Sequence, residues 1–197
     1  MTTIAADTAS AAYLKSKFEA GKAYDDYVAT GNESQRDGWR GVYERAALTD
    51  AQRALVEGFT REINVIVVTG VWCGDCVQQL PLLERIAEAS NGKVSVRYLD
   101  RDEHMDLAEQ LKVNEGVRVP VAIFAAEDFE RVSIFGDRTL ARYRAMAARQ
   151  LGPSCPLPGA PIDGDELDAT LQDWLGEAER VHLLLRLSAR LRQKHGD

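Results

Sequence analysis

The order of apolar and polar residues along the middle of the chain predicts alternating strands and helices. Residues 63–68 (INVIVV) form a short, β-branched apolar run that is typical of a buried strand. Residues 76–90 carry apolar side chains at helical spacing and predict an amphipathic helix. The same reasoning predicts further strands at 94–99, 119–125 and 131–135 and helices at 105–111 and 139–150. The order β-α-β-α-β-β-α predicts an α/β sheet whose last two strands are antiparallel.

Residues 10–58 precede this alternation and predict helices throughout. Apolar side chains from Tyr13 to Tyr24 mark a first helical segment, and those around Trp39 mark a second one. Residues 49–52 (TDAQ) have the pattern of a capping box and predict the start of a short third helix. The N-terminal part of the chain is therefore expected to be an all-helical extension.

A stretch rich in Pro and Gly at residues 151–161 predicts a loop after the alternating region. From Gly164 to about Gln193 the pattern predicts one long helix, with acidic residues at its start and basic residues at its end. Its apolar stripe favours packing on the rest of the chain over a coiled coil. We therefore divide the chain into an N-terminal helical extension (1–59), an α/β domain (60–150), and a linker with a C-terminal helix (151–197).

Composition and charge narrow the class of protein. The chain has 197 residues, enough to bury a core without disulfides, and its net charge of −7 argues against nucleic acid or an anionic membrane surface as a partner. Three cysteines are too few for a secreted disulfide scaffold. We recognise neither a signal peptide nor a membrane span. These features predict a cytoplasmic protein, in which paired cysteines serve catalysis or metal binding.

The most informative chemistry is a Cys-x-x-Cys motif, Cys73 and Cys76, between the strand at 63–68 and the helix that follows. A helix N-terminus has unsatisfied N–H groups and a partial positive charge, which favour the thiolate of the first cysteine. The spacing lets the second sulfur approach from the same helical turn and close a disulfide. A motif of this kind at a strand-to-helix junction indicates a redox site.

Four features in this order resemble the thioredoxin family. Residues 72–76 (WCGDC) stand where thioredoxins carry WCGPC, and Pro81 stands where the family has a proline in the active-site helix. Val119-Pro120 occupies the place of the family's cis-proline, and Gly136 follows at the spacing of a glycine beside the same groove. The resemblance covers about half of the chain and implies a thioredoxin-like fold with helices added at both ends. The WCGDC variant is similar to a smaller bacterial branch and to cytosolic thioredoxin-related proteins.

The resemblance implies a role for each of these residues. Cys73 would attack a substrate disulfide and form a mixed disulfide, which Cys76 would resolve. Trp72 would offer the substrate a flat apolar platform beside the sulfur. The substrate groove would also include Val119, Pro120 and Gly136. The implied partners are a disulfide-containing protein or small molecule and, as electron donor, a reductase or a small thiol; no cofactor or metal is implied.

Asp75 departs from the family pattern. Thioredoxins carry a buried acid six residues before the first cysteine, and here that position is Val67. One hypothesis is that Asp75 replaces this acid as the proton acceptor of Cys76, and that its charge raises the pKa of both thiols. The alternative is that Asp75 is a favourable acidic residue in the first turn of the helix. The sequence does not decide between them.

The leading interpretation is a thiol–disulfide oxidoreductase that acts as a reductase in the cytoplasm. A metal or cluster site is a rival, but the motif supplies only two of the four ligands required, so dimerisation would have to complete it. A second rival is a non-enzymatic adaptor that keeps the fold as a scaffold and binds partners through its helical extensions. The cysteine spacing argues against a third, a thiol peroxidase. The sequence does not predict the oligomeric state.

For three further side chains, a functional role is weighed against a purely structural or surface role. His104 could join Asp100 and Asp102 as a metal ligand, but a solvated loop that caps the next helix is favoured. Cys155 could form a regulatory disulfide, but an unpaired loop cysteine is favoured. Arg118 lies before the Val119-Pro120 pair, where selection of acidic substrates and a plain surface role are equally plausible.

Overall fold

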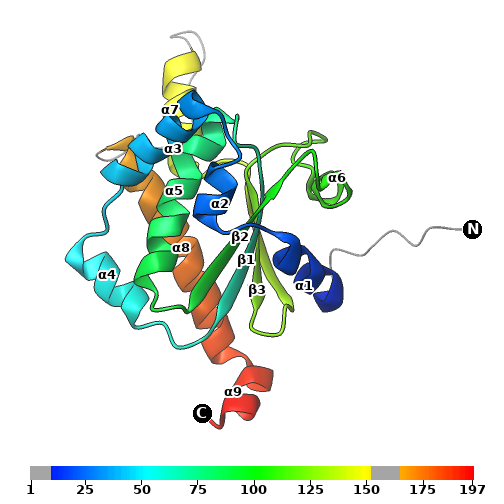
Figure 1. The fold of residues 1–197 in the computed structure, drawn as a ribbon. Coiled ribbons are helices and arrows are strands. Elements are labelled where there is room, and N and C mark those ends of the chain that lie inside the picture. The colour runs from blue at the N-terminus through cyan, green and yellow to red at the C-terminus, as the bar shows by residue number, and fades with distance from the viewer. Residues whose placement is uncertain (1–9, 152–164) are drawn as a thin grey trace, which may run out of the picture.

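A mixed sheet of four strands forms the centre of the protein in the computed structural model, which describes residues 10–151 and 165–197 (Figure 1). The strands are β1 (Ile63–Thr69), β2 (Val94–Asp100), β3 (Val121–Ala126) and β4 (Arg131–Gly136), in the order β2-β1-β3-β4. β1 pairs with β2 in parallel, while the β1–β3 and β3–β4 pairs are antiparallel. The predicted mixed α/β sheet with an antiparallel last pair is thus confirmed.

The helices between the strands follow the predicted alternation closely. They are α5 (Gly74–Ala89), α6 (Met105–Ala108) with a 3-10 turn (Glu109–Leu111), and α7 (Leu140–Gln150). α5 begins two residues earlier than predicted and contains Pro81. α5 lies on one face of the sheet, and α6 lies on the other together with the first N-terminal helix, α1 (Ala11–Ala20) (Figure 1).

The described part of the N-terminal extension, from residue 10 onward, contains four helices rather than the three predicted: α1, α2 (Tyr24–Val28), α3 (Glu33–Arg45) and α4 (Asp50–Glu57). The predicted continuous first segment is wrong because the chain leaves the helix at Gly21. Lys22 then pairs with Tyr98 on edge strand β2 through two backbone hydrogen bonds of 2.9 Å. Satisfying the free N–H and C=O groups of an edge strand outweighs continued helical spacing. The capping box that opens α4 is present as predicted.

Residues 165–197 form two helices, α8 (Glu166–Leu187) and α9 (Ala189–His195), where one long helix was predicted. The chain turns at Ser188, whose backbone is extended. The turn directs α9 back so that Leu191 is completely buried and His195 lies 2.8 Å from a carboxylate oxygen of Glu127 in the β3–β4 turn. Burial of Leu191 and this hydrogen bond between side chains are gained only if the helix breaks.

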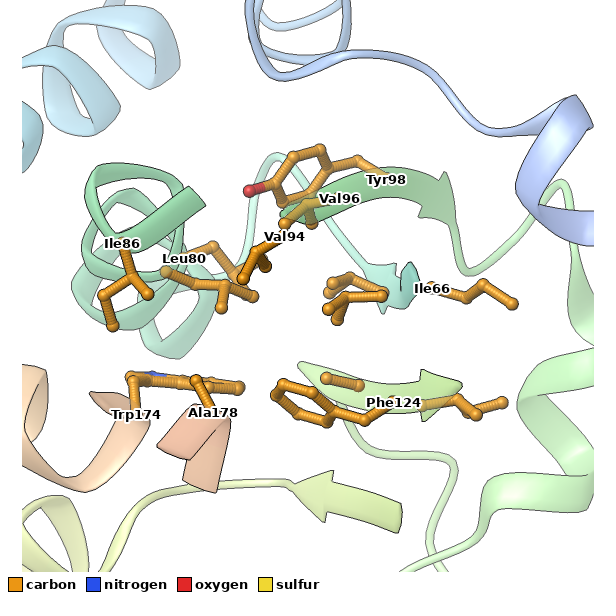
Figure 2. Close-up of a cluster of buried hydrophobic side chains, with 14 of the residues drawn as sticks. Ile66, Leu80, Ile86, Val94, Val96, Tyr98, Phe124, Trp174 and Ala178 are labelled. Atoms are coloured by element: carbon orange, nitrogen blue, oxygen red, sulfur yellow. The ribbon is translucent and has the colours of Figure 1, made fainter. Parts of the chain in front are cut away.

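The helical ends and the sheet share one hydrophobic core. Figure 2 shows Trp174 and Ala178 of α8 beside Phe124 of β3 and facing Leu80 and Ile86 of α5. Trp174 is completely buried, and its ring meets that of Phe135 edge-on at 4.9 Å between centroids. On the N-terminal side, Trp39 of α3 is completely buried as well. The two tryptophans anchor the extensions to the sheet.

Candidate active site

The Cys-x-x-Cys motif lies where β1 gives way to α5. Cys73 is the N-cap residue of α5 and is half-buried, whereas Cys76, in the first turn, is completely buried. Both thiols are free. The strand end and the helix start therefore place one accessible and one inaccessible sulfur side by side.

The environment of Cys73 favours its thiolate. A hydrogen bond from the Cys76 thiol is the largest influence and outweighs burial, and the backbone N–H groups of Cys76 and Asp75 act in the same direction. Together they lower the pKa of Cys73 to about 6, although the negative charge of Asp75 opposes them weakly. At neutral pH Cys73 is therefore mostly a thiolate, the form that acts as a nucleophile.

The environment of Cys76 has the opposite effect. Burial, above all, and then the hydrogen bond and charge of Cys73 raise its pKa well above the usual value for a thiol. Cys76 consequently keeps its proton and donates it in the hydrogen bond to Cys73. The two neighbouring sulfurs therefore differ in protonation state at neutral pH.

The chain at Val119 and Pro120 faces the Cys73 sulfur. The peptide bond between the two residues is cis, and the Val119 carbonyl oxygen lies 3.6 Å from Cys73 Sγ. Gly136 stands opposite Val121 in the β3–β4 ladder with a φ of +144°. A Cβ atom there would lie 2.4 Å from the Pro120 carbonyl oxygen, so only glycine fits. The sequence-predicted residues Val119, Pro120 and Gly136 are thus brought together beside Cys73.

Trp72 forms part of the exposed rim of the site. Its side chain is 47 % exposed, and the guanidinium carbon of Arg101 lies 4.7 Å from the centroid of its ring. An open hollow of about 650 Å³ adjoins the two residues Trp72 and Cys73. The rest of the hollow is lined by Gly74, Asp75, Gln78, Arg142, Met146, Arg149 and Gln150. Cys73 is therefore open to a substrate from the side where α5 and α7 meet.

Asp75 is an ion-pair partner of two arginines. Arg138 Nε lies 2.9 Å from one carboxylate oxygen of Asp75, and Arg142 Nη2 lies 3.0 Å from the other. Burial by itself would raise the pKa of Asp75, but the hydrogen bonds from the two guanidinium groups hold it below its usual value. Both oxygens are thus engaged on the α7 side of the site. The arginines follow Asp75 by more than 60 residues, and no local spacing identifies them.

Gln79 and Asp137 support the site, although sequence analysis did not predict a role for either residue. Gln79 is completely buried in α5; its amide donates to the Asp137 carbonyl oxygen at 3.2 Å and accepts from the Thr139 N–H at 3.1 Å. Arg118 lies 3.1 Å from the buried Asp137 carboxylate, so it has a structural partner beside the groove. The available signal was a polar Gln79 on the apolar face of a predicted helix.

Helix α3 of the N-terminal extension holds the loop that precedes the motif. Trp39 Nε1 donates a hydrogen bond of 2.9 Å to the carbonyl oxygen of Val71. The turn before α3 packs on the same residue, since a Cβ atom on Gly31 would lie 2.8 Å from a Val71 methyl group. The extension therefore directly contacts the loop that precedes the Cys-x-x-Cys motif, which sequence reasoning did not predict.

The described residues offer no group of three or more His, Cys, Asp or Glu side chains able to hold a metal ion. His104 lies at the start of α6, with its Nδ1 atom 3.4 Å from Lys17 Nζ. His182 accepts a hydrogen bond from the Thr60 N–H at 3.0 Å. Cys155 lies outside the described residues. Within residues 10–151 and 165–197, the structure contains no helix long and apolar enough to cross a membrane.

Comparison with known proteins identifies relatives at the levels of family and fold. A family model described as thioredoxin matches residues 21–149. The crystal structure of a protein of unknown function from Pseudomonas aeruginosa is similar, with a TM-score of 0.66, 16 % identity, and coverage of 84 % of this chain and 93 % of that one. An HIV epitope scaffold matches with a TM-score of 0.62, 15 % identity, and coverage of 85 % and 95 % respectively. At these identities the two structures show a shared fold alone.

Proposed function

This chain belongs to the thioredoxin family, and from that premise we propose that it is a thiol–disulfide oxidoreductase with Cys73 and Cys76 as its redox pair. The family supports disulfide chemistry in general, and the pairing of the two sulfurs supports this particular site. The single observation that carries the proposal is the contrast between a half-buried Cys73 with a pKa of about 6 and a buried, protonated Cys76.

The reaction begins at Cys73. Its thiolate attacks one sulfur of a substrate disulfide, a bond forms between the two sulfurs, and the other substrate sulfur leaves as a thiolate and takes up a proton. Cys76 then attacks Cys73 Sγ; the Cys73–Cys76 bond forms, and the bond from Cys73 to the substrate breaks. The substrate gains two electrons, and the Cys73–Cys76 pair loses two. A small thiol or a reductase restores the dithiol.

Substrate binding is proposed at the groove around Cys73. The main chain at Val119 and Pro120 faces the sulfur, so an extended substrate chain would lie there with its disulfide against Cys73. Trp72 would support the substrate on the exposed side. Gly136 keeps the Pro120 carbonyl in place, because any side chain there would collide with it. A cytoplasmic reductase is the form of this activity that we propose.

The proposal is tested by reduction of a disulfide-linked test protein, with dithiothreitol as the source of electrons. We expect the parent chain to catalyse the reduction and Cys73→Ser to abolish it. Cys155→Ser is the matched control, since it also removes one thiol, and it should keep the parent rate. No catalysis by the parent chain, with both motif thiols free, would reject the enzyme and favour an adaptor that uses the fold as a scaffold.

A further inference from the structure

Cys76 is buried, yet the proposed reaction requires its sulfur to acquire a negative charge. To resolve the mixed disulfide it must become a thiolate in a site with no exposure to solvent, where burial strongly disfavours a charge. Val67 supplies no acid on the central strand, and the Asp75 carboxylate is turned to Arg138 and Arg142. Another group must stabilise the sulfur as its charge develops.

Two buried hydroxyl groups stand behind this sulfur. Thr69 is the last residue of β1 and Tyr27 belongs to α2; their exposed fractions are 0 % and 1 %. Neither hydroxyl makes a well-formed hydrogen bond within the described part of the chain. Buried polar groups are rarely left in this state, so each one calls for an explanation.

The Thr69 hydroxyl is close enough to both the Cys76 thiol and the Tyr27 hydroxyl to influence their ionisation, although its geometry in the structure falls short of a full hydrogen bond to either. Burial chiefly raises the pKa of Cys76 and of Tyr27, and in both cases the Thr69 hydroxyl acts in the opposite direction through hydrogen bonding. The titratable groups that act on this pocket are Cys73, on the thiol, and Asp100 at the end of β2, on the tyrosine. Thr69 is therefore a donor within reach of the one sulfur that has to acquire a charge in the interior.

Tyr24 provides a contrast from the same aromatic cluster. Its hydroxyl is also buried without a well-formed partner among the described residues, and its ring packs on Trp39 and Tyr98 at nearly the same distances as that of Tyr27. After burial, the strongest influence on Tyr24 is the charge of Glu84, whereas Tyr27 is influenced by Thr69 and Cys76. Of the two tyrosines, Tyr27 is therefore the one linked to Thr69 and Cys76.

We propose that the Thr69 hydroxyl, oriented by the Tyr27 hydroxyl of the N-terminal extension, donates a hydrogen bond to Cys76 Sγ while that sulfur attacks the mixed disulfide. This inference rests on the proposed function. In this role Thr69 contacts the reacting sulfur during the attack and is a catalytic residue, whereas Tyr27 acts through Thr69 and is a positioning residue. The pair stands in for a buried carboxylate, and the helical extension thereby becomes part of the active site.

The step balances without a further reactant. The Cys76 proton passes to the departing substrate thiolate, the Cys73–Cys76 bond forms, and the electron pair of the Cys73–substrate bond goes to the substrate sulfur. The Thr69 proton is shared with the sulfur but not transferred. Removal of the hydroxyl should thus slow resolution and leave the first attack by Cys73 unchanged.

The test combines two measurements on the full chain carrying Cys155→Ser. In the first, Cys73 is replaced by alanine, and the pKa of Cys76 is measured by NMR of ¹³Cβ-labelled cysteine. In the second, Cys73 is kept, and the decay of a mixed disulfide on Cys73 is timed by rapid mixing. We expect Thr69→Val to raise the pKa of Cys76 and to slow the decay about 10- to 100-fold, as for a lost hydrogen bond to a charged group. Thr69→Ser should restore both, and Tyr27→Phe should give a smaller change in the same direction.

Tyr24→Phe is the matched control and should leave both values unchanged. Equal values for Thr69→Val and the parent chain, or equal effects of Tyr27→Phe and Tyr24→Phe, would overturn the inference. Thr69→Ala tests the same hydroxyl if valine disturbs the fold. The NMR titration does not depend on activity, so a parent chain that fails to reduce disulfides would reject the proposed function alone.

Discussion

The pKa of Cys73 is predicted to depend more on Cys76 than on any other residue. It is about 6 in the structure, against 9.0 for an unperturbed thiol, and the hydrogen bond from Cys76 is the largest cause. At pH 7 a pKa of 6 corresponds to about 90 % thiolate, and a pKa of 9 to about 1 %. Cys76→Ala removes the bond but leaves the backbone N–H groups of the helix start. We therefore expect a pKa between these limits and a clear loss of thiolate at pH 7.

The assay is the rate of alkylation by iodoacetamide as a function of pH, in a chain carrying Cys155→Ser so that only motif thiols react. The parent profile should have its midpoint near pH 6, and Cys76→Ala should move the midpoint upward by about one unit or more. Cys76→Ser keeps a hydrogen-bond donor and should move it less. An identical midpoint for parent and Cys76→Ala would refute the assignment of the shift to this hydrogen bond.

Asp75→Asn tests the remaining charge in the motif with the same assay. The Asp75 carboxylate raises the pKa of Cys73, but it is the last of the causes. Its removal also frees the charges of Arg138 and Arg142, which act in the same direction as the loss of a negative charge. The midpoint should fall, by less than about one unit. A slower resolution by Cys76 in this variant would instead support Asp75 as its proton acceptor.

Two further predictions concern the pH dependence of stability and the shape of the groove. Burial raises the pKa of Glu84 to about 7, so its stabilising contribution is complete below the unfolded value near 4.5 and is lost as the pH rises through 7. Glu84→Gln should therefore increase the free energy of unfolding in urea at pH 8 by about 2 kcal/mol, after allowance for partial exposure. If the free energy of unfolding of this variant still falls with pH between pH 4.5 and 7, Glu84 is not the source of the pH dependence. Gly136→Ala places a Cβ atom 2.4 Å from the Pro120 carbonyl oxygen at a positive φ. Disulfide reduction should therefore be lost, and the free energy of unfolding should fall by more than about 1 kcal/mol. A variant with the parent rate and stability would show that the segment at Pro120 can move freely.

Local pattern was sufficient for the elements that carry the motif. The β-branched run of β1 and the helical spacing of α5 can be read within short windows, because a strand buried on both faces leaves a continuous apolar run and a helix buried on one face leaves a periodic pattern. The capping box of α4 is equally local. The position of Cys73 at a helix start, and hence the tendency of its thiol to ionise, follows from the same short range.

Breaks in helices were not readable, because their causes lie elsewhere in the chain. The residues from Tyr13 to Tyr24 have helical spacing throughout, yet Lys22 leaves the helix to pair with Tyr98. The C-terminal helix turns at Ser188 so that Leu191 reaches the core. In both cases a tertiary contact outweighs a local preference worth only a few tenths of a kcal/mol per residue.

The sequence by itself determined the order of the elements, the α/β class, and the placement of two thiols at one helix start. Only the tertiary structure decided the surroundings of those thiols and hence their pKa values. It directs Asp75 to two arginines on and just before α7, brings Trp39 to the Val71 carbonyl, and sets Tyr27 and Thr69 behind Cys76. Apart from Thr69, which precedes Cys76 by seven residues, these partners are separated by 30 or more residues along the chain, and a pKa depends on burial and on neighbours in space. Neither quantity exists before the chain has folded.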